Sequence, residues 1–398
     1  MRPVACGHHP PTPRSPGLTT ATIAAPRAQQ QRRRVPLWDT ARFVAVILVV
    51  IGHSTLKLIS GSDPSYALYL FVYAFHIPVF VLISGYFARA EQGVRKLRAT
   101  MTTVIIPYLV FQTIWSLVHW GLDGELKLDY SSAWWTLWFL VALAIWRIAL
   151  PYLAILRFPI TISLVLSIGI GYVSTIDDTF AAARVVGLLP FFVIGWRLKQ
   201  WKVADRWMDL GPRDVLRIRL AAVAVFVVVA VLLGVFIDVW RDVLLRRFLL
   251  YDESYTSFGY DAWWAGAIRI ATIAVALLLS AAFLVLMPRR QTALTAFGQR
   301  TLYVYLLHSF LLYPLRESGL LDGHHSVWVL VAVVLLSVGI AVLLGLPFVK
   351  TVFRPLVEPR LDWLFVLSRK QQRGGKRPGD PAAPDPVQEP IAGVGAAE

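Results

Sequence analysis

Residues 220–240 have the sequence LAAVAVFVVVAVLLGVFIDVW, and residues 262–287 have the sequence AWWAGAIRIATIAVALLLSAAFLVLM. Each run is almost wholly apolar and reaches the ~20 residues that a helix needs to cross a bilayer. The whole chain has 57% apolar and 16% charged residues, whereas a soluble domain has about 25% charged residues. Its mean hydropathy is +0.61. These features predict an all-α protein that crosses the membrane repeatedly.

The chain contains about ten such stretches, so we predict a polytopic transmembrane helix bundle. The sixth stretch is the weakest, because Arg184 and Pro190 interrupt it. The predicted spans are residues 38–58, 66–88, 101–121, 133–149, 158–176, 180–197, 220–240, 262–287, 297–316 and 326–348.

Two polar segments flank the predicted membrane domain of residues 37–367. Residues 1–36 are rich in Pro, Thr, Gln and Arg, and residues 368–398 are rich in Gly, Pro and charge. We expect both to be disordered cytosolic tails. The first has no apolar run, so it is not a secretory signal peptide. Cys6 is the only cysteine, which excludes an internal disulfide and a thiol nucleophile in the membrane domain.

The loop charges orient the bundle. If the N-terminus is cytosolic, most loop lysines and arginines fall on the cytosolic side, as the positive-inside rule requires. Both chain ends are then cytosolic, and we expect a multi-pass protein of the cell (plasma) membrane, surrounded by lipid. The net charge of +15 is explained by these loops and predicts no nucleic-acid partner. The basic residues assigned to the outer side are Lys57, Lys127, Arg184, Arg241, Arg246, Arg247 and Arg316.

The first span carries an arginine and a histidine on one face. Arg42 and His53 are eleven residues apart, which is about 20° beyond three turns and about 16 Å along the axis. Arg42 lies near the cytosol and His53 lies deeper, toward the outside. Asp39 can pair with Arg42. Because ionisable groups within a membrane usually face a functional cavity, we place all three in a candidate catalytic set. The alternative is a snorkelling arginine and a histidine bonded to a neighbouring helix.

Two further histidines lie at mid-membrane depth. His76 precedes Pro78, which breaks the helical hydrogen-bond ladder and frees a carbonyl. His308 lies in the ninth span. Both indicate a polar pocket, or else structural histidines bonded to backbone carbonyls. Ser84, later in the second span, is another auxiliary candidate. No carboxylate–histidine cluster is spaced for a metal, so none is predicted.

Five groups of short motifs occur in a fixed order along the predicted spans. They cover the region from the first span to the ninth. The chain resembles the acyltransferase family 3 membrane proteins, in particular the branch similar to fucose 4-O-acetylase. The carrying segments are Trp38-Asp39 through Arg42 to Gly52-His53, Phe75-His76-Ile77-Pro78-Val79-Phe80 with Ile83-Ser84-Gly85-Tyr86, Trp138-Phe139-Leu140 with Ala142-Leu143, Leu189-Pro190-Phe191-Phe192 with Gly195, and Phe297-Gly298 with Tyr303-Val304-Tyr305-Leu306-Leu307-His308.

The resemblance implies a ten-span O-acyltransferase. Such an enzyme takes an acyl group, often acetyl, from acyl-coenzyme A and passes it to a hydroxyl of a sugar, a polysaccharide or another extracytoplasmic acceptor. The family's arginine and histidine pair maps onto Arg42 and His53, and its Arg-x-x-Arg after the second span maps onto Arg95 and Arg98. Arg95 and Arg98 are either topogenic or, with Arg42, bind the phosphates of the co-substrate acyl-CoA (acetyl-CoA).

The chemistry of histidine fits this implication. We predict that His53 is the general base for the acceptor hydroxyl. His76 and His308 either orient His53 or stabilise the oxyanion. Direct transfer and a transient acyl-His53 intermediate both remain open. The rival function is a proton-coupled transporter or flippase in which His53 and His76 form a proton relay. The acceptor, the acyl chain and the oligomeric state are left open by the sequence.

Overall fold

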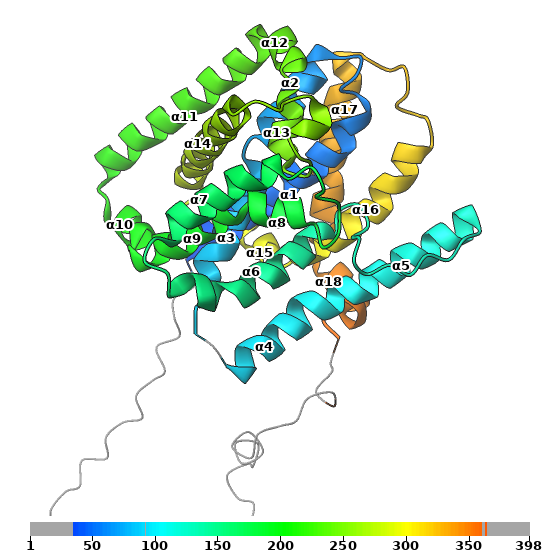
Figure 1. Cartoon of the computed structure of the whole chain (residues 1–398), viewed down its shortest axis with the longest axis horizontal. Coiled ribbons are helices and arrows are strands. Elements are labelled where there is room, and N and C mark those ends of the chain that lie inside the picture. The colour runs from blue at the N-terminus through cyan, green and yellow to red at the C-terminus, as the bar shows by residue number, and fades with distance from the viewer. Residues whose placement is uncertain (1–34, 92, 360–362, 364–398) are drawn as a thin grey trace, which may run out of the picture. The chain divides into compact units, whose positions relative to one another are not determined.

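The computed structural model describes residues 35–91, 93–359 and 363 (Figure 1). Within these residues no strand forms, and the predicted all-α polytopic helix bundle is confirmed. The predicted tails lie outside the described residues, apart from Val35 and Pro36.

The first half of the chain forms nine helices among the described residues, and a π-helical turn at Met101–Ile105 joins α4 to α5. Their bounds are α1 (Pro36–Ser54), α2 (Asp63–Tyr73), α3 (His76–Phe87), α4 (Val94–Thr100), α5 (Ile106–Asp123), α6 (Trp138–Ala154), α7 (Pro159–Gly169), α8 (Ala182–Gly187) and α9 (Leu189–Gln200).

Nine more helices follow in the described part of the second half. Their bounds are α10 (Val203–Asp209), α11 (Pro212–Val235), α12 (Ile237–Asp242), α13 (Leu245–Leu250), α14 (Trp264–Leu286), α15 (Ala293–Gly298), α16 (Thr301–Glu317), α17 (Val327–Leu344) and α18 (Pro347–Val357).

All ten predicted spans fall on helical segments, although their ends differ. In the described ranges, six segments are long and apolar enough to cross a membrane: α1, the pair α2 and α3, the run from α4 to α5, α11, α14 and α17. Helices α6 and α7 are shorter and apolar. The predicted start of the seventh span at residue 220 is wrong, because the helix begins at Pro212, where proline favours the first turn.

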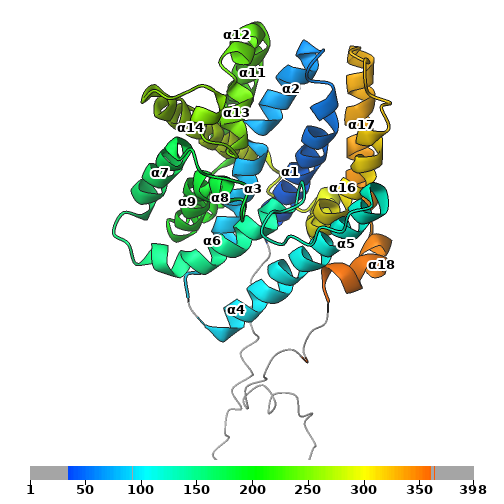
Figure 2. The ribbon, with the colours of Figure 1, turned by 45° about the vertical axis from the view of Figure 1, so that its right-hand side comes forward.

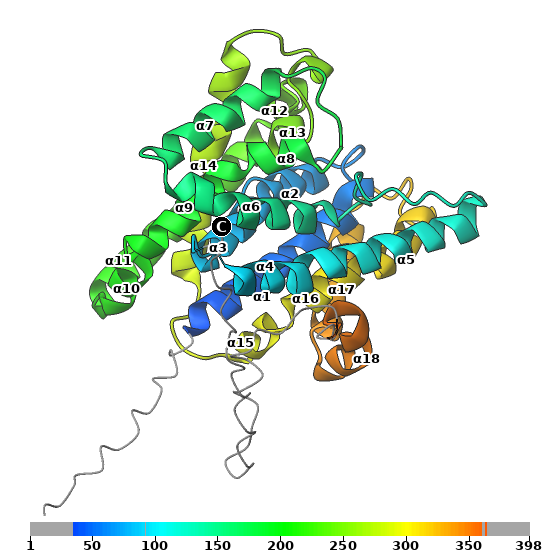
Figure 3. The ribbon, with the colours of Figure 1, turned by 60° about the horizontal axis from the view of Figure 1, so that its bottom comes forward.

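Helix α1 lies at the centre of the packing. It contacts α3, α15, α16 and α17 (Figure 2). In its apolar stretch 67% of the residues are buried within the protein, whereas the figure for α11 is 11%. Side chains of α11 therefore face lipid, and those of α1 face other helices. Helices α4, α15 and α18 lie at the end of the bundle where α1 begins, which is the predicted cytosolic end (Figure 3).

Two of the predicted spans are broken helices. The second span leaves its helix at Ala74 and Phe75, so the predicted break is confirmed, and Pro78 lies in the first turn of α3, where a missing N–H costs little. The sixth span breaks at Leu188, two residues before Pro190. A helix can break at membrane depth where other protein groups donate hydrogen bonds to the backbone carbonyls that the break leaves unpaired.

Side chains supply those groups at the second break. The Ser167 hydroxyl donates to the carbonyl of Gly187 at 2.5 Å. The Trp146 indole donates to the carbonyl of Val185 at 2.8 Å. Both carbonyls belong to α8, so α8 can end inside the bundle without an unpaired backbone acceptor at these two positions.

Helices α3 and α9 cross at two glycines. A methyl group on Gly85 would overlap the carbonyl oxygen of Phe192, and one on Gly195 would overlap the carbonyl oxygen of Leu82. Small residues let helix backbones approach this closely in membranes. Both glycines belong to the sequence motifs, and the crossing gives a packing reason for them.

We expect Gly85→Ala to destabilise the bundle by about 1–3 kcal/mol, because the added methyl group forces α3 and α9 apart. Thermal unfolding of the detergent-purified protein measures this. Gly234→Ala in α11 is the matched control, since nothing lies within 4 Å of its added methyl group. Equal melting temperatures for the two variants would contradict the crossing as a packing constraint.

Candidate active site

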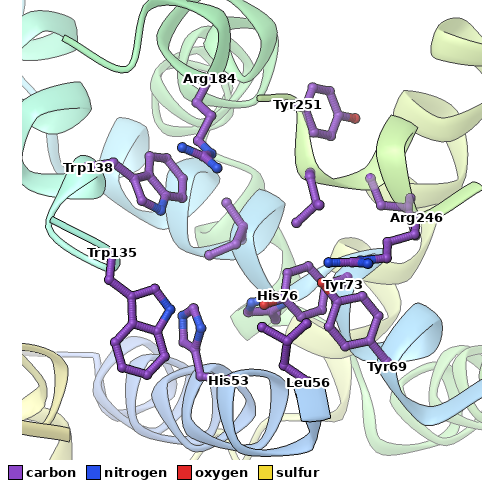
Figure 4. A pocket seen from close by; sticks show the side chains of 13 residues that line it. His53, Leu56, Tyr69, Tyr73, His76, Trp135, Trp138, Arg184, Arg246 and Tyr251 are labelled. Carbon is purple, nitrogen blue, oxygen red and sulfur yellow. The ribbon is translucent and has the colours of Figure 1, made fainter. Parts of the chain in front are cut away.

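A pocket of about 160 Å³ lies beside the C-terminal end of α1 (Figure 4). Its walls come from α1, α2, α3, α8 and α13, and from the segment that leads into α6. Elements that are far apart in the sequence therefore meet at one place. The lining residues are His53, Leu56, Tyr69, Tyr73, His76, Ile77, Trp135, Trp138, Arg184, Arg246, Leu249, Leu250 and Tyr251.

His53 faces this pocket from the last turn of α1. Its ring lies edge-on to Trp135, with centroids 5.3 Å apart, and 5.6 Å from the ring of His308. In the described part of the chain, no hydrogen bond to its ring nitrogens is found. The alternative of a histidine bonded to a neighbouring helix therefore does not describe His53, whose nitrogens are available to a ligand.

His76 begins α3 directly after the helix break. It is buried, and its Nδ1 donates to the carbonyl of Val72 at 2.8 Å. A carbonyl can only accept a hydrogen bond, so Nδ1 carries the hydrogen and Nε2 is left as an acceptor. His76 thus bonds to a backbone carbonyl at the helix break, although not to the one that Pro78 frees, and it also lines the pocket.

His308 lies next to His53 but does not line the pocket. Its Nδ1 donates to the carbonyls of Tyr305 at 2.7 Å and Val304 at 3.1 Å. Its Nε2 is buried and has no hydrogen-bond partner among the described residues. By the same logic this nitrogen is an acceptor. Both auxiliary histidines therefore present a lone pair.

Aromatic side chains form much of the pocket wall. The rings of Tyr69 and Tyr73 stack at 4.0 Å, and Tyr73 lies edge-on to His76 at 4.6 Å. Trp135 and Trp138 stand on the other side (Figure 4). Such rings offer broad apolar faces and keep polar tips for hydrogen bonding, which suits a ligand with both apolar and polar surfaces.

Two arginines also line the pocket. Arg184 forms an ion pair with Asp252 at 2.7 Å and lies over the ring of Trp138 at 5.1 Å. Arg246 lies over the ring of Tyr69 at 5.6 Å, and its Nε is buried without a hydrogen-bond partner in the described ranges. Asp252 follows α13 in a loop, where burial raises the pKa of its carboxyl and the Arg184 guanidinium opposes that shift.

A third arginine holds the loop that carries these residues. Arg269 in α14 is only 2% exposed, its Nη1 donates to the carbonyl of Phe248 at 2.8 Å, and its Nε donates to the Tyr255 hydroxyl at 3.2 Å. Its guanidinium also lies 4.1 Å from the ring of Tyr251. Arg269 therefore fixes the segment from α13 to Tyr255 against α14.

Arg42 and Asp39 lie at the other end of α1. Their predicted pairing is confirmed, with Arg42 Nη1 and Asp39 Oδ1 3.6 Å apart. The Arg42 guanidinium also lies 4.3 Å from the ring of Phe87. Asp39 is buried. Neither residue lines the pocket, and the length of α1 separates Arg42 from His53 by about 16 Å.

Other cations extend this end of the bundle. The charges of Arg42 and Arg147 act on each other, and so do those of Arg147 and Lys96. The Nη1 of Arg147 donates to the Thr103 hydroxyl in the π-helical turn at 3.2 Å. The Nζ of Lys96 is buried and lacks a hydrogen-bond partner among the described residues. We call Arg42, Arg147 and Lys96 the inner cation cluster.

A family model described as an acyltransferase domain matches residues 36–346 of the chain. The chain belongs to acyltransferase family 3. The match runs from α1 to α17, so it includes the pocket, His53 and the inner cation cluster. Together with the apolar helices, it identifies a membrane acyltransferase. No curated protein and no solved structure matches the chain. The fucose 4-O-acetylase branch stays a prediction.

The remaining site predictions can be placed in this acyltransferase. Ser84 lies eight residues beyond His76 in α3, about 12 Å along the axis, and does not line the pocket. Arg95 is exposed and Arg98 is half-buried on α4; their binding of phosphate stays a prediction. Among the described residues no group of three His, Cys, Asp or Glu side chains is placed to hold a metal.

The face of α1 between its two ends is packed. Val46 and Val49 lie between Arg42 and His53 on that face and are 0% and 3% exposed. Val46 belongs to a core cluster with side chains of α5, α6 and α16. A substrate that reaches from the inner cation cluster to His53 must displace these contacts.

Sequence reasoning placed Arg184 and Arg246 only as outer-side basic residues. A signal for their role was present, because basic residues on the outer side are exceptions to the positive-inside rule. Three other outer arginines have specific partners: Arg241 pairs with Asp63 at 2.8 Å, Arg247 pairs with Glu253, and Arg316 lies over Trp135 at 5.2 Å.

We expect Arg269→Gln to lower the free energy of unfolding by about 1–3 kcal/mol, because it leaves buried acceptors unpaired. It should also expose the loop at residues 251–263 to protease. Melting temperature and limited proteolysis measure these effects. Arg290→Gln is the control, since Arg290 is exposed. A loop equally resistant in both variants would refute the anchoring role of Arg269.

Proposed function

We propose that this membrane acyltransferase moves an acyl group, acetyl by default, from acyl-CoA to a hydroxyl of a sugar or polysaccharide outside the cytosol. We assign it to the plasma membrane. The observation that carries the proposal is His53. Its ring faces a pocket with aromatic walls and lacks a hydrogen-bond partner among the described residues. Imidazole is the side chain best suited to exchange a proton near neutral pH.

His53 acts as the general base in this mechanism. It takes the proton of the acceptor hydroxyl while the hydroxyl oxygen attacks the carbonyl carbon of the thioester. The tetrahedral intermediate then collapses, and its carbon–sulfur bond breaks. The departing thiolate takes the proton back from the imidazolium. The products are an ester on the acceptor and free coenzyme A thiol, and His53 is restored. Direct transfer needs no acyl-histidine.

The tautomers of the other two histidines favour orientation over oxyanion binding. Each uses its only N–H on a backbone carbonyl. The free Nε2 of His308, beside His53, can accept a hydrogen bond from the imidazolium or from a bridging water. Neither neutral ring can donate to an oxyanion from Nε2. We therefore propose that His308 orients His53 and that His76 accepts a hydrogen bond from the acceptor.

The inner cation cluster is proposed to hold the donor. The phosphates of coenzyme A are anions, and planar guanidinium groups bind phosphate well. The predicted topology places Arg42, Arg147 and Lys96 toward the cytosol, where acyl-CoA is found. The pantetheine arm then follows α1 toward His53. Because Val46 and Val49 are buried on that face, donor binding must part α1 from its neighbours.

The transporter alternative requires both His53 and His76 to bind and release protons. A relay of His53 and His76 needs each ring to pass protons, but the Nδ1 of His76 is held on the Val72 carbonyl. Proteoliposomes test this function directly. Uptake of a saccharide without consumption of acetyl-CoA would favour transport over acyl transfer.

We expect His53→Ala to lower acyl transfer by roughly 10²–10⁴-fold, the usual contribution of a positioned acid–base group. Labelled acetyl-CoA and purified protein in nanodiscs, with an extract of envelope saccharides as acceptor, measure the transfer. His324→Ala, at an exposed outer loop, is the control and should keep wild-type activity. Transfer by His53→Ala at the rate of the control would exclude His53 as the base.

We expect Arg42→Ala to raise the KM for acetyl-CoA by about 10–100-fold, because a charge-assisted contact to phosphate is lost. The kcat should change less, since Arg42 lies far from His53. Initial rates at varied donor concentration give both constants. Arg157→Ala removes an exposed arginine and serves as the control. A KM equal to that of the control would rule out phosphate docking at Arg42.

A further inference from the structure

Arg246 is the charge in the pocket that the protein leaves without a counter-charge. Arg184 has Asp252, and the neighbouring Arg247 has Glu253. Among the described residues, no carboxylate lies within ion-pairing distance of Arg246, and its buried Nε has no hydrogen-bond partner. Its guanidinium interacts with the ring and the hydroxyl of Tyr69, which carry no charge. The pocket therefore holds one positive charge that the surrounding side chains do not neutralise.

This arginine has no topogenic explanation. It belongs to the set assigned to the outer side, where the positive-inside rule disfavours arginine. A half-buried guanidinium without a counter-charge near a membrane is also costly. Side chains of this kind usually mark a substrate path or a ligand counter-charge. The position of Arg246, in the same wall as Tyr69, Tyr73 and His76, directs its charge at whatever occupies the pocket (Figure 4).

The residues on α14 and α8 increase the positive charge around the ligand. Arg269 lies behind Tyr251, and its hydrogen-bond acceptors include the Phe248 carbonyl and the Tyr255 hydroxyl, which are uncharged. Arg184 lines the pocket as well, and Asp252 offsets its charge. The charged groups that face the pocket therefore sum to a net positive field.

We propose that the acceptor of this acyltransferase is an acidic sugar. Its carboxylate or phosphate binds Arg246, with Arg184 nearby, while one of its hydroxyls lies at His53 and its ring lies between the tyrosine and tryptophan walls. A guanidinium binds either anion through two parallel hydrogen bonds. This inference rests on the proposed function, because it names the substrate class that His53 activates.

Binding to the full-length protein in nanodiscs tests the proposal without acetyl-CoA. The probes are three oligosaccharides that end in glucose, glucuronate or glucose 6-phosphate, and so differ only at one carbon. We expect at least one acidic probe to bind about 10–100-fold more tightly than the neutral probe. Rising salt should weaken that preference. Comparison of the carboxylate and phosphate probes identifies which anion the acceptor carries.

Arg246→Gln should abolish the preference, and Arg247→Gln should keep it, because Arg247 does not line the pocket and is already paired. Equal binding of all three probes by the wild-type protein would overturn the proposal, whether or not the variant folds. So would an unchanged preference in a folded Arg246→Gln variant.

The two proposals fail in different ways. A preference for acidic probes, without transfer of acetyl to any of them or to an envelope saccharide extract, would overturn the proposed function and leave an anionic-saccharide site at Arg246. Acetyl transfer to neutral and acidic probes with equal kcat/KM would overturn the acidic acceptor and leave His53 as the base.

Discussion

The hydrocarbon core of a bilayer supplies no water to a polar group, so the helix breaks in this bundle depend on hydrogen bonds from other parts of the protein. At the break before α3, the His76 ring donates a hydrogen bond to the carbonyl of Val72. At the break between α8 and α9, side chains of α6 and α7 donate hydrogen bonds to carbonyls of α8. The buried Arg269 donates hydrogen bonds to a carbonyl of α13 and to the hydroxyl of Tyr255. These five hydrogen bonds help to place α3, α8 and α13 around one pocket.

Several buried side-chain atoms of the described residues have no hydrogen-bond partner, and three of them bear on the proposals. The Nε2 of His308, beside His53, and the Nε of Arg246, in the pocket wall, are buried without a partner in the described part of the chain. A third such atom, the Nζ of Lys96, lies in the inner cation cluster. They are the groups on which the proposals for catalysis, acceptor charge and donor binding rest. Of these three atoms, the Nε of Arg246 belongs to a residue that lines the pocket, where a ligand can supply the missing acceptor.

Under the proposed function, the same bundle separates two substrates. Helix α1 reaches from the inner cation cluster to His53, and the face between them is closed by Val46 and Val49. In this proposal the thin pantetheine arm of the donor passes between α1 and its neighbours, and the sugar binds in the pocket at the other end of α1. The separation fits an acyltransferase whose donor and acceptor lie on opposite sides of a membrane. Among the segments long enough to span a membrane, α1 and the pair α2 and α3 are the most buried within the protein. A displacement of α1 on donor binding would therefore shift the helices packed around it.

The sequence by itself determined the fold class, the predicted spans, the pairing of Asp39 with Arg42, the helix break near Pro78 and the family, because hydropathy, helical spacing and local motifs are properties of short stretches of chain. It also singled out His53 and His76, since ionisable residues in apolar runs are visible without a structure. Only the tertiary structure decided that Arg184 and Arg246 share a pocket with His53 and that Ser84 does not. Those residues come from separate helices, and their meeting depends on how α8 and α13 pack, through contacts between residues that are far apart in the chain.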